Sequence, residues 1–176
     1  MDPLATLLAK EEIRELVLLY SRGVDRKDIA LLRDLYTADA TDTHGDSFDG
    51  PADAYCDFLE RSLPHMHYSG HHACNHLIHV DGDANGNAWG DGEVYAIAWH
   101  VIPDGQGGLK HDVRLVRYID RYRREGDGRW RFAKRVVTYD AHYVTAAGDQ
   151  SAMADPIHDP SYGELASRLF ARGARG

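Results

Sequence analysis

The sequence predicts a single α+β domain in which helices cover one face of a curved sheet. The chain of 176 residues is long enough for one compact domain and short for two. Apolar residues recur at helical spacing in its first part, and long segments with strand character fill its second part. Because the helices precede the strands and do not alternate with them, the order favours an α+β arrangement.

The first helix is expected from Leu4 to Val24, where apolar residues recur at steps of three and four and form one stripe. A proline and a glycine near its two ends suit helix termini. A shorter helix is expected from Ile29 to Tyr36, and a third from Pro51 to Leu63. Between them, Ala38 to His44 is typical of a short strand.

Four extended segments follow, namely His72–Val80, Trp89–Ile102, Leu109–Arg123 and Trp130–Thr145. The segments between them, DGDANGN, PDGQGG and EGDGR, are rich in the Gly, Asp and Asn residues that hairpin turns require. This succession predicts a long antiparallel meander. We therefore expect a domain over residues 1–145 and a polar tail over residues 146–176, which could be a lid, a subunit-contact arm or a loosely held end.

The composition indicates which classes of partner the protein can bind. A formal net charge of −8, from 28 acidic and 20 basic residues, argues against a nucleic-acid surface and favours a small-molecule substrate or a protein partner. No apolar run approaches the ~20 residues that span a membrane. The segment MDPLATLLAKEEIREL lacks the pattern of a secretory signal. Cys56 and Cys74 are too few for a disulfide framework. We expect a cytoplasmic protein without a membrane partner.

Eleven histidines are present, and six of them fall between His65 and His79. His65, His67 and His71 would share a strand face only if the strand ran unbroken through Gly70. Neither a His-Glu-x-x-His motif nor a two-His-one-carboxylate pattern is present. We therefore expect no metal site.

His71 and Asp25 form a candidate catalytic pair. An imidazole is a useful general base when a carboxylate fixes its tautomer and stabilises its protonated form. The same residues are also compatible with structural roles, Asp25 as a cap or turn residue and His71 as a hydrogen-bonded histidine at a strand start. Spacing alone leaves both interpretations open.

Two further residues have alternative interpretations. Tyr20 lies on the apolar stripe of the first helix, where its phenol either packs in the core or donates a hydrogen bond into a pocket. Alternation along WRFAKRVVTYD places Arg135 with Ala133 and Val137 and not with Phe132. On that face Arg135 is either a solvated edge charge or an inward cation that holds an anionic substrate group.

The chain resembles the SnoaL-like branch of the nuclear transport factor 2 (NTF2) superfamily over about residues 8–145. The resemblance rests on the ordered recurrence of five stretches, EEIRELVLLYSRGVDRKD, LYTADATDTHGDSFDGPAD, HHACNHLIHVDGDANGNA, VRYIDRYRREGDGRWRF and KRVVTYD. It implies an NTF2-like cone, in which three N-terminal helices pack on a strongly curved mixed or antiparallel sheet that encloses a pocket.

Members that this sequence resembles include scytalone dehydratase, the bile-acid 7α-dehydratase and hexachlorocyclohexane dehydrochlorinase, which eliminate water or HCl without a metal or organic cofactor. The resemblance implies a dyad of His71 and Asp25, with Asn75 completing the H-x-x-x-N pattern. Tyr20 matches the tyrosine of a Tyr-x-x-x-x-Asp pair. Arg135 matches an arginine near the start of the last strand in the dehydrochlorinases.

The remaining pocket candidates are Tyr95, Trp99 and Tyr139 as aromatic walls, together with Asn75 and His44. His44, in the DTHG segment, either supports the site or marks a different substrate class. Relatives of this type commonly form trimers or dimers through the exposed sheet face, so the resemblance also implies a homotrimer or homodimer.

The expected function is elimination from a bulky, apolar alicyclic or aromatic alcohol. His71 would remove a proton, Asp25 would orient it, and Tyr20 would assist the leaving group. Tyr20 or Arg135 would stabilise an enolate if the substrate carries a carbonyl. The alternatives are a formaldehyde-releasing lyase acting on lignin-derived diaryl propanediols, a non-catalytic binding module and a β subunit that supports an oxygenase.

Overall fold

The computed structural model describes residues 2–82 and 87–175 and confirms the α+β fold. The first half carries α1 (Pro3–Asp25), α2 (Ile29–Asp34), β1 (Tyr36–His44), β2 (Phe48–Pro51), α3 (Ala52–Ser62) and the 3-10 turn η1 (Leu63–His65). The second half carries β3 (Tyr68–Gly82), β4 (Ala88–Pro103), β5 (Leu109–Arg124), β6 (Trp130–Ala146), α4 (Ser161–Glu164) and η2 (Arg168–Phe170).

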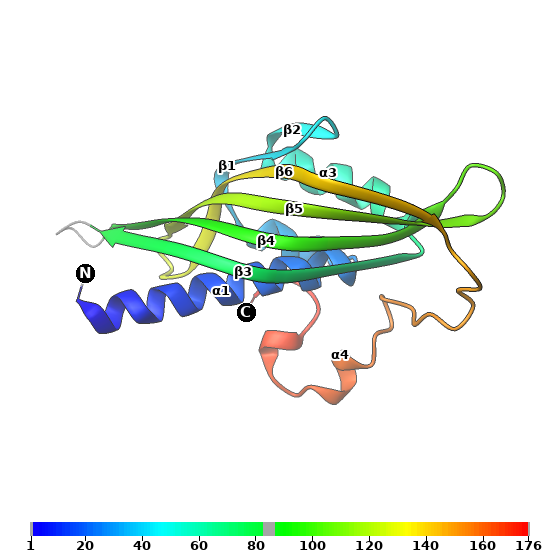
Figure 1. The fold of residues 1–176 in the computed structure, drawn as a ribbon. Coiled ribbons are helices and arrows are strands. Elements are labelled where there is room, and N and C mark those ends of the chain that lie inside the picture. Colours follow the sequence, from blue (N-terminus) through cyan, green and yellow to red (C-terminus); the bar gives the residue numbers. More distant parts are fainter. Residues whose placement is uncertain (1, 83–86, 176) are drawn as a thin grey trace.

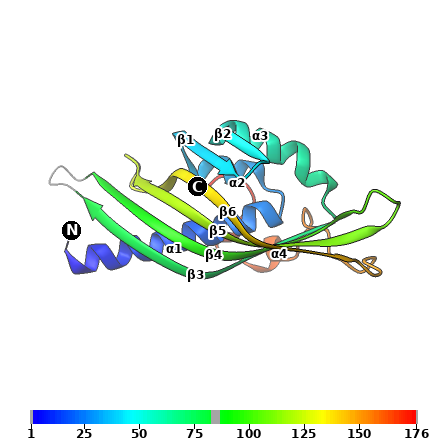
Figure 2. The same ribbon diagram turned by 45° about the horizontal axis from the view of Figure 1, so that its top comes forward.

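The six strands form one curved, unclosed sheet in the order β2-β1-β6-β5-β4-β3, as Figures 1 and 2 show. Strands β3 to β6 are the expected antiparallel meander. β1 pairs with β6 in parallel, so the sheet is mixed. β3 and β2 are its two edge strands, and α1 lies along the sheet on the side of β3 (Figure 1).

From Ile13 to Val24 the apolar stripe of α1 is buried, whereas Leu4, Leu7 and Leu8 at the start of the helix are exposed. Asp2 caps the helix, and its carboxylate accepts from the amides of Leu4 and Ala5. Gly23 allows α2 to pack closely on α1. A Cβ atom at this position would lie 2.8 Å from Cδ2 of the buried Leu32. The turn between the two helices therefore brings the C-terminal end of α1, with Asp25, next to the sheet.

The elements that differ from the sequence-based expectation include α2 and β2. α2 ends at Asp34, because the amide of Phe132 donates to the carbonyl of Leu35 and draws the chain into the sheet, where Tyr36 begins β1. The short strand β2 was not anticipated, since four residues ending in a proline carry little alternation. The turn DGDANGN lies largely outside the described residues.

The described part of the tail, residues 147–175, returns to the helices, and its last part lies below α1 in Figure 1. Arg26 pairs with Asp159 at 2.9 Å, and Arg175 pairs with Asp34 at 2.8 Å. The guanidinium of Arg22 donates to the carbonyl oxygen of Phe170. Within the described part of the chain, no helix is both long and apolar enough to cross a membrane.

Candidate active site

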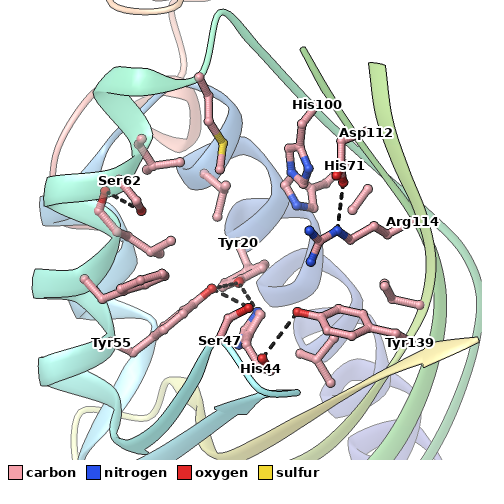
Figure 3. A pocket seen from close by; sticks show the side chains of 18 of the residues that line it. Tyr20, His44, Ser47, Tyr55, Ser62, His71, His100, Asp112, Arg114 and Tyr139 are labelled. Carbon is pink, nitrogen blue, oxygen red and sulfur yellow. Dashed lines mark hydrogen bonds and ion pairs between the residues drawn. The ribbon is translucent and has the colours of Figure 1, made fainter. Parts of the chain in front are cut away.

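A cavity of about 190 Å³ lies between α1, α3 and the inner face of the sheet (Figure 3). Its walls are largely apolar, and the polar or charged side chains that line it include Tyr20, His44, Tyr55, His71, His100, Asp112, Arg114 and Tyr139. Cavities for drug-sized ligands are commonly ~300–1,000 Å³. The present volume therefore favours a compact ligand of one or two rings.

His71 and Asp25 meet at one side of this cavity, as the resemblance implied. Nδ1 of His71 lies 2.7 Å from Oδ1 of Asp25, and the His71 amide donates to Oδ2 at 2.9 Å. The hydroxyl of Ser69 also donates to Asp25, at 3.1 Å. Three hydrogen bonds thus fix a carboxylate whose side chain is 14% exposed. This arrangement favours the tautomer that leaves Nε2 of His71 without a proton and able to accept one.

His100 stands beside His71, with 5.3 Å between the ring centroids. Burial lowers the pKa of His100 to about 4, and the neighbouring charge of His71 acts in the same direction. His100 is therefore neutral near pH 7. A neutral imidazole beside the base can form a hydrogen bond with a ligand without adding a competing positive charge.

The opposite side of the cavity holds a second histidine–carboxylate pair. Nδ1 of His44 contacts Oδ1 of the fully buried Asp42, and Oδ2 of Asp42 accepts a hydrogen bond from the Tyr36 hydroxyl at 2.7 Å. Nε2 of His44 lies 2.9 Å from the Tyr55 hydroxyl and 3.4 Å from that of Tyr20. Figure 3 shows this cluster across the cavity from His71 and His100.

The two phenols of the cluster also contact each other, at 3.2 Å. Burial raises the pKa of Tyr20, and the cation of Arg135 opposes this shift. Burial likewise raises the pKa of Tyr55 well above its usual value, and the neighbouring Tyr20 adds to the effect. Both hydroxyls therefore carry their protons at neutral pH and act as hydrogen-bond donors.

Tyr139 lines the cavity as expected, and its hydroxyl donates to the backbone carbonyl of His44 at 3.3 Å. The neighbouring Gly45 has a φ of 50°, and a Cβ there would lie 2.5 Å from the Tyr139 ring. Glycine at position 45 therefore allows the aromatic ring to close over the turn that carries His44.

Arg114 supplies a positive charge inside the cavity. Its Nε donates to Oδ1 of Asp112 at 2.7 Å, and its guanidinium lies 5.2 Å from the Tyr139 ring centroid. The hydrogen bond to Asp112 raises the pKa of Arg114 against the effect of burial. In Figure 3 the guanidinium points between the two histidine clusters. Arg114 can therefore contact an anionic or carbonyl oxygen of a ligand.

Arg135 does not line the cavity. It is fully buried, and its Nε and Nη2 donate to the two carboxylate oxygens of Asp120 at 2.8 and 2.7 Å. Burial opposes its charge, but Asp120 outweighs burial and keeps the pKa of Arg135 above its usual value. The predicted separation of Arg135 from Phe132 was wrong, because β6 has an extra residue at Ala133 relative to β5, and this bulge places Arg135 on the inward face with both Phe132 and Val137.

Tyr95, Trp99 and Asn75 also lie away from the cavity lining, contrary to expectation. Tyr95 and Trp99 are 45% and 40% exposed on the outer face of β4, where they contact Arg117 and His111. Asn75 is exposed beside a register shift in β3. The residues that project inward from β4 include Ala96, Ala98 and His100.

Sequence reasoning did not identify several polar residues of the lining, among them Tyr55, His100, Asp112 and Arg114. Alternation carried a usable signal for His100, because two-residue steps connect it with the small apolar residues Ala96 and Ala98. Tyr55 lies among other apolar residues of α3, and a helical pattern does not tell a core tyrosine from a cavity tyrosine. Across the described ranges, no group of three His, Cys, Asp or Glu side chains is arranged to hold a metal ion.

Comparison with known proteins gives a consistent result at the level of fold. A family model described as a SnoaL-like domain matches residues 5–136. None of the curated proteins compared with the chain is significantly similar to it in sequence.

Several solved structures are similar. A candidate scytalone dehydratase from Novosphingobium aromaticivorans is 21% identical, with a TM-score of 0.64 over 84% of this chain and 97% of that chain. A type 3 hexachlorocyclohexane dehydrochlorinase from Novosphingobium barchaimii is 19% identical, with a TM-score of 0.64 over 80% of this chain and 92% of that one. A Mycobacterium tuberculosis protein of unknown function is 19% identical, with a TM-score of 0.64 over 89% of this chain and 88% of that one.

Proposed function

The chain belongs to the SnoaL-like domain family, and from the geometry of its cavity we propose that it is a lyase that eliminates water from a compact, apolar alicyclic or aromatic alcohol without a cofactor. The observation that carries this proposal is the contact of 2.7 Å between Nδ1 of His71 and Asp25 at the wall of an apolar cavity. Solved structures of similar fold include proteins named as a dehydratase and a dehydrochlorinase, which supports the same reaction class.

In the proposed reaction His71 is the general base. Asp25 accepts from Nδ1 and stabilises the imidazolium that forms when Nε2 removes a proton from carbon. The carbon–oxygen bond on the adjacent carbon then breaks, and Tyr20 donates a hydrogen bond to the departing oxygen.

Arg114 takes the role that the sequence suggested for Arg135. If the substrate carries a carbonyl group next to the acidic carbon, negative charge develops on the carbonyl oxygen as the proton leaves. A cation held by Asp112 inside a largely apolar cavity stabilises that charge. We place this reaction in the cytoplasm, where Cys56 and Cys74, which form no disulfide, would remain reduced.

The test is a turnover screen by mass spectrometry with compact candidate alcohols, namely hydroxytetralones, reduced naphthalenones and aryl propanediols. Wild-type protein should convert at least one of them with loss of water. Removing the general base should lower the rate by about 10²–10⁴-fold in His71→Gln. Asp25→Asn should also be impaired, because its amide can support the wrong tautomer of His71.

His158→Gln is a matched control, because His158 forms a similar contact with Asp155, 2.6 Å long, on the exposed tail. It should retain full activity. Loss of formaldehyde from a propanediol would replace the dehydratase assignment with carbon–carbon cleavage. Tight binding without turnover, unaffected by His71→Gln, would show that the protein is a binding module.

A further inference from the structure

We propose that the His44–Asp42 pair, acting through Tyr55, is the proton source for the departing hydroxyl, so that the cavity holds a base on one side and an acid on the other. This inference rests on the proposed function and deepens it. It assigns Tyr55 as the proton donor and His44 as the residue that positions and recharges it. It also narrows the substrate to alcohols whose leaving oxygen needs a proton.

The contacts form a continuous chain from a buried carboxylate to the cavity. Asp42 is fully buried, and its two oxygens contact His44 and the Tyr36 hydroxyl. His44 then reaches Tyr55 at 2.9 Å, and Tyr55 reaches Tyr20 at 3.2 Å. The rings of His44 and Tyr55 are also stacked, with 4.4 Å between their centroids. His44, Tyr55 and Tyr20 all line the cavity.

The protonation state of His44 decides where the phenol proton points. When Nε2 of His44 carries no proton, it accepts the proton of Tyr55, and the phenol directs its hydrogen away from a ligand. When Nε2 is protonated, it donates to the Tyr55 oxygen, and Asp42 balances the charge. The Tyr55 proton is then free to point into the cavity. Without a protonated His44, the Tyr55 phenol would have no second proton to replace the one that it donates.

The proton balance of the step is as follows. His71 takes a proton from carbon, the electron pair of that bond forms the double bond, and the adjacent carbon–oxygen bond breaks. Tyr55 gives its proton to the departing oxygen while His44 gives its Nε2 proton to the Tyr55 oxygen. Water leaves, His71 is protonated and His44 is neutral, and transfer of one proton from His71 to His44 through solvent restores the starting state.

This arrangement distinguishes alcohols from substrates with stable anionic leaving groups. Hydroxide is a poor leaving group and benefits from a proton in the transition state, whereas acetate leaves without one. A cavity that needed only a base would have no use for a second histidine–carboxylate pair aimed at two phenols. The pair on the Asp42 side therefore favours dehydration of a β-hydroxy carbonyl compound.

The experiment compares two probes that give the same product. 3-Hydroxy-1-tetralone loses water, and 3-acetoxy-1-tetralone loses acetate, and both yield fluorescent 1-naphthol after tautomerisation. With His44→Gln, we expect the rate on the hydroxy probe to fall about 10²-fold or more and the rate on the acetoxy probe to change less than about fivefold. Tyr55→Phe should show the same selective loss, His71→Gln should lose both reactions, and His158→Gln should lose neither.

The acetoxy probe also reports whether each variant is folded and its cavity intact. Equal losses on both probes in folded His44→Gln and Tyr55→Phe variants, or no loss on either, would overturn the acid assignment and leave the base assignment standing. No His71-dependent naphthol formation from either probe would overturn the proposed dehydratase function, and the acid assignment with it.

Discussion

Arg135 lies outside the cavity but packs against the ring of Tyr20, which lines the cavity. Its guanidinium lies 4.1 Å from the ring centroids of Tyr20 and Phe132 and 4.3 Å from that of Tyr118. Its Nη1 has no hydrogen-bond partner among the described residues, so the cation is stabilised by Asp120 and by its contacts with these three aromatic rings. The buried pair of Arg135 and Asp120 thus supports the ring of Tyr20, whose hydroxyl reaches the cavity.

Breaking the Arg135–Asp120 pair should lower the free energy of unfolding. Asp120→Asn leaves a buried, uncompensated cation, a change that typically costs about 3–5 kcal/mol. The free energy of unfolding in urea measures this loss. Glu11→Gln, which breaks an exposed pair with Arg14, should cost less than about 1 kcal/mol. An Asp120→Asn protein of wild-type stability that had lost its activity would instead support a direct role of Arg135 in the chemistry.

At the scale of elements, bulges and docking decide which side chains reach the cavity. The extra residue at Ala133 reverses the alternation of β6 between Phe132 and Arg135. The tail also lies next to the dyad. Its residues Met153, Pro156 and Asp159 line a second cavity together with Asp25 and His71. The dyad therefore lies between the main cavity and a surface covered by the tail.

Reversing the charge of Arg175, near the end of the tail, should weaken the contact between the tail and Asp34. Arg175 donates from its backbone amide and from its guanidinium to Asp34, so Arg175→Glu places two carboxylates together. We expect faster amide hydrogen exchange over residues 168–175, with α1 unchanged. Arg168→Glu makes the same charge change at an exposed tail position and should leave exchange unaltered. Unchanged exchange in Arg175→Glu would show that other contacts hold the tail.

At the scale of the whole molecule, the outer sheet face carries the aromatic residues that were expected in the pocket. Tyr95, Trp99 and Tyr143 are exposed on this face. Tyr143 of β6 pairs with Val113 of β5, and Val113 pairs in turn with Trp99 of β4. Exposed aromatic residues that gather on one face are typical of a protein interface. We propose that this face forms a homodimer or homotrimer.

Trp99→Glu should dissociate this assembly, because it places a charge in an apolar interface. Light scattering after size-exclusion chromatography should give the mass of two or three chains for the wild type and a lower mass for the variant. Leu18→Glu changes an exposed leucine of α1 and should leave the mass unaltered. A wild-type protein with the mass of one chain would contradict the proposal.

The sequence by itself determined the fold class, the first helix and the meander, because periodicity and turn residues are local properties. The pairing of His71 with Asp25 was implied only by the family resemblance, since spacing alone left their roles open. Only the tertiary structure decided which face of each strand lines the cavity. Arg135 was expected to contact solvent or a substrate, but the bulge in β6 turns it toward Asp120. The positive charge inside the cavity comes instead from Arg114, on β5. Strand register, and with it the meeting of His44, Tyr55 and Tyr20, depends on contacts between residues far apart in the chain.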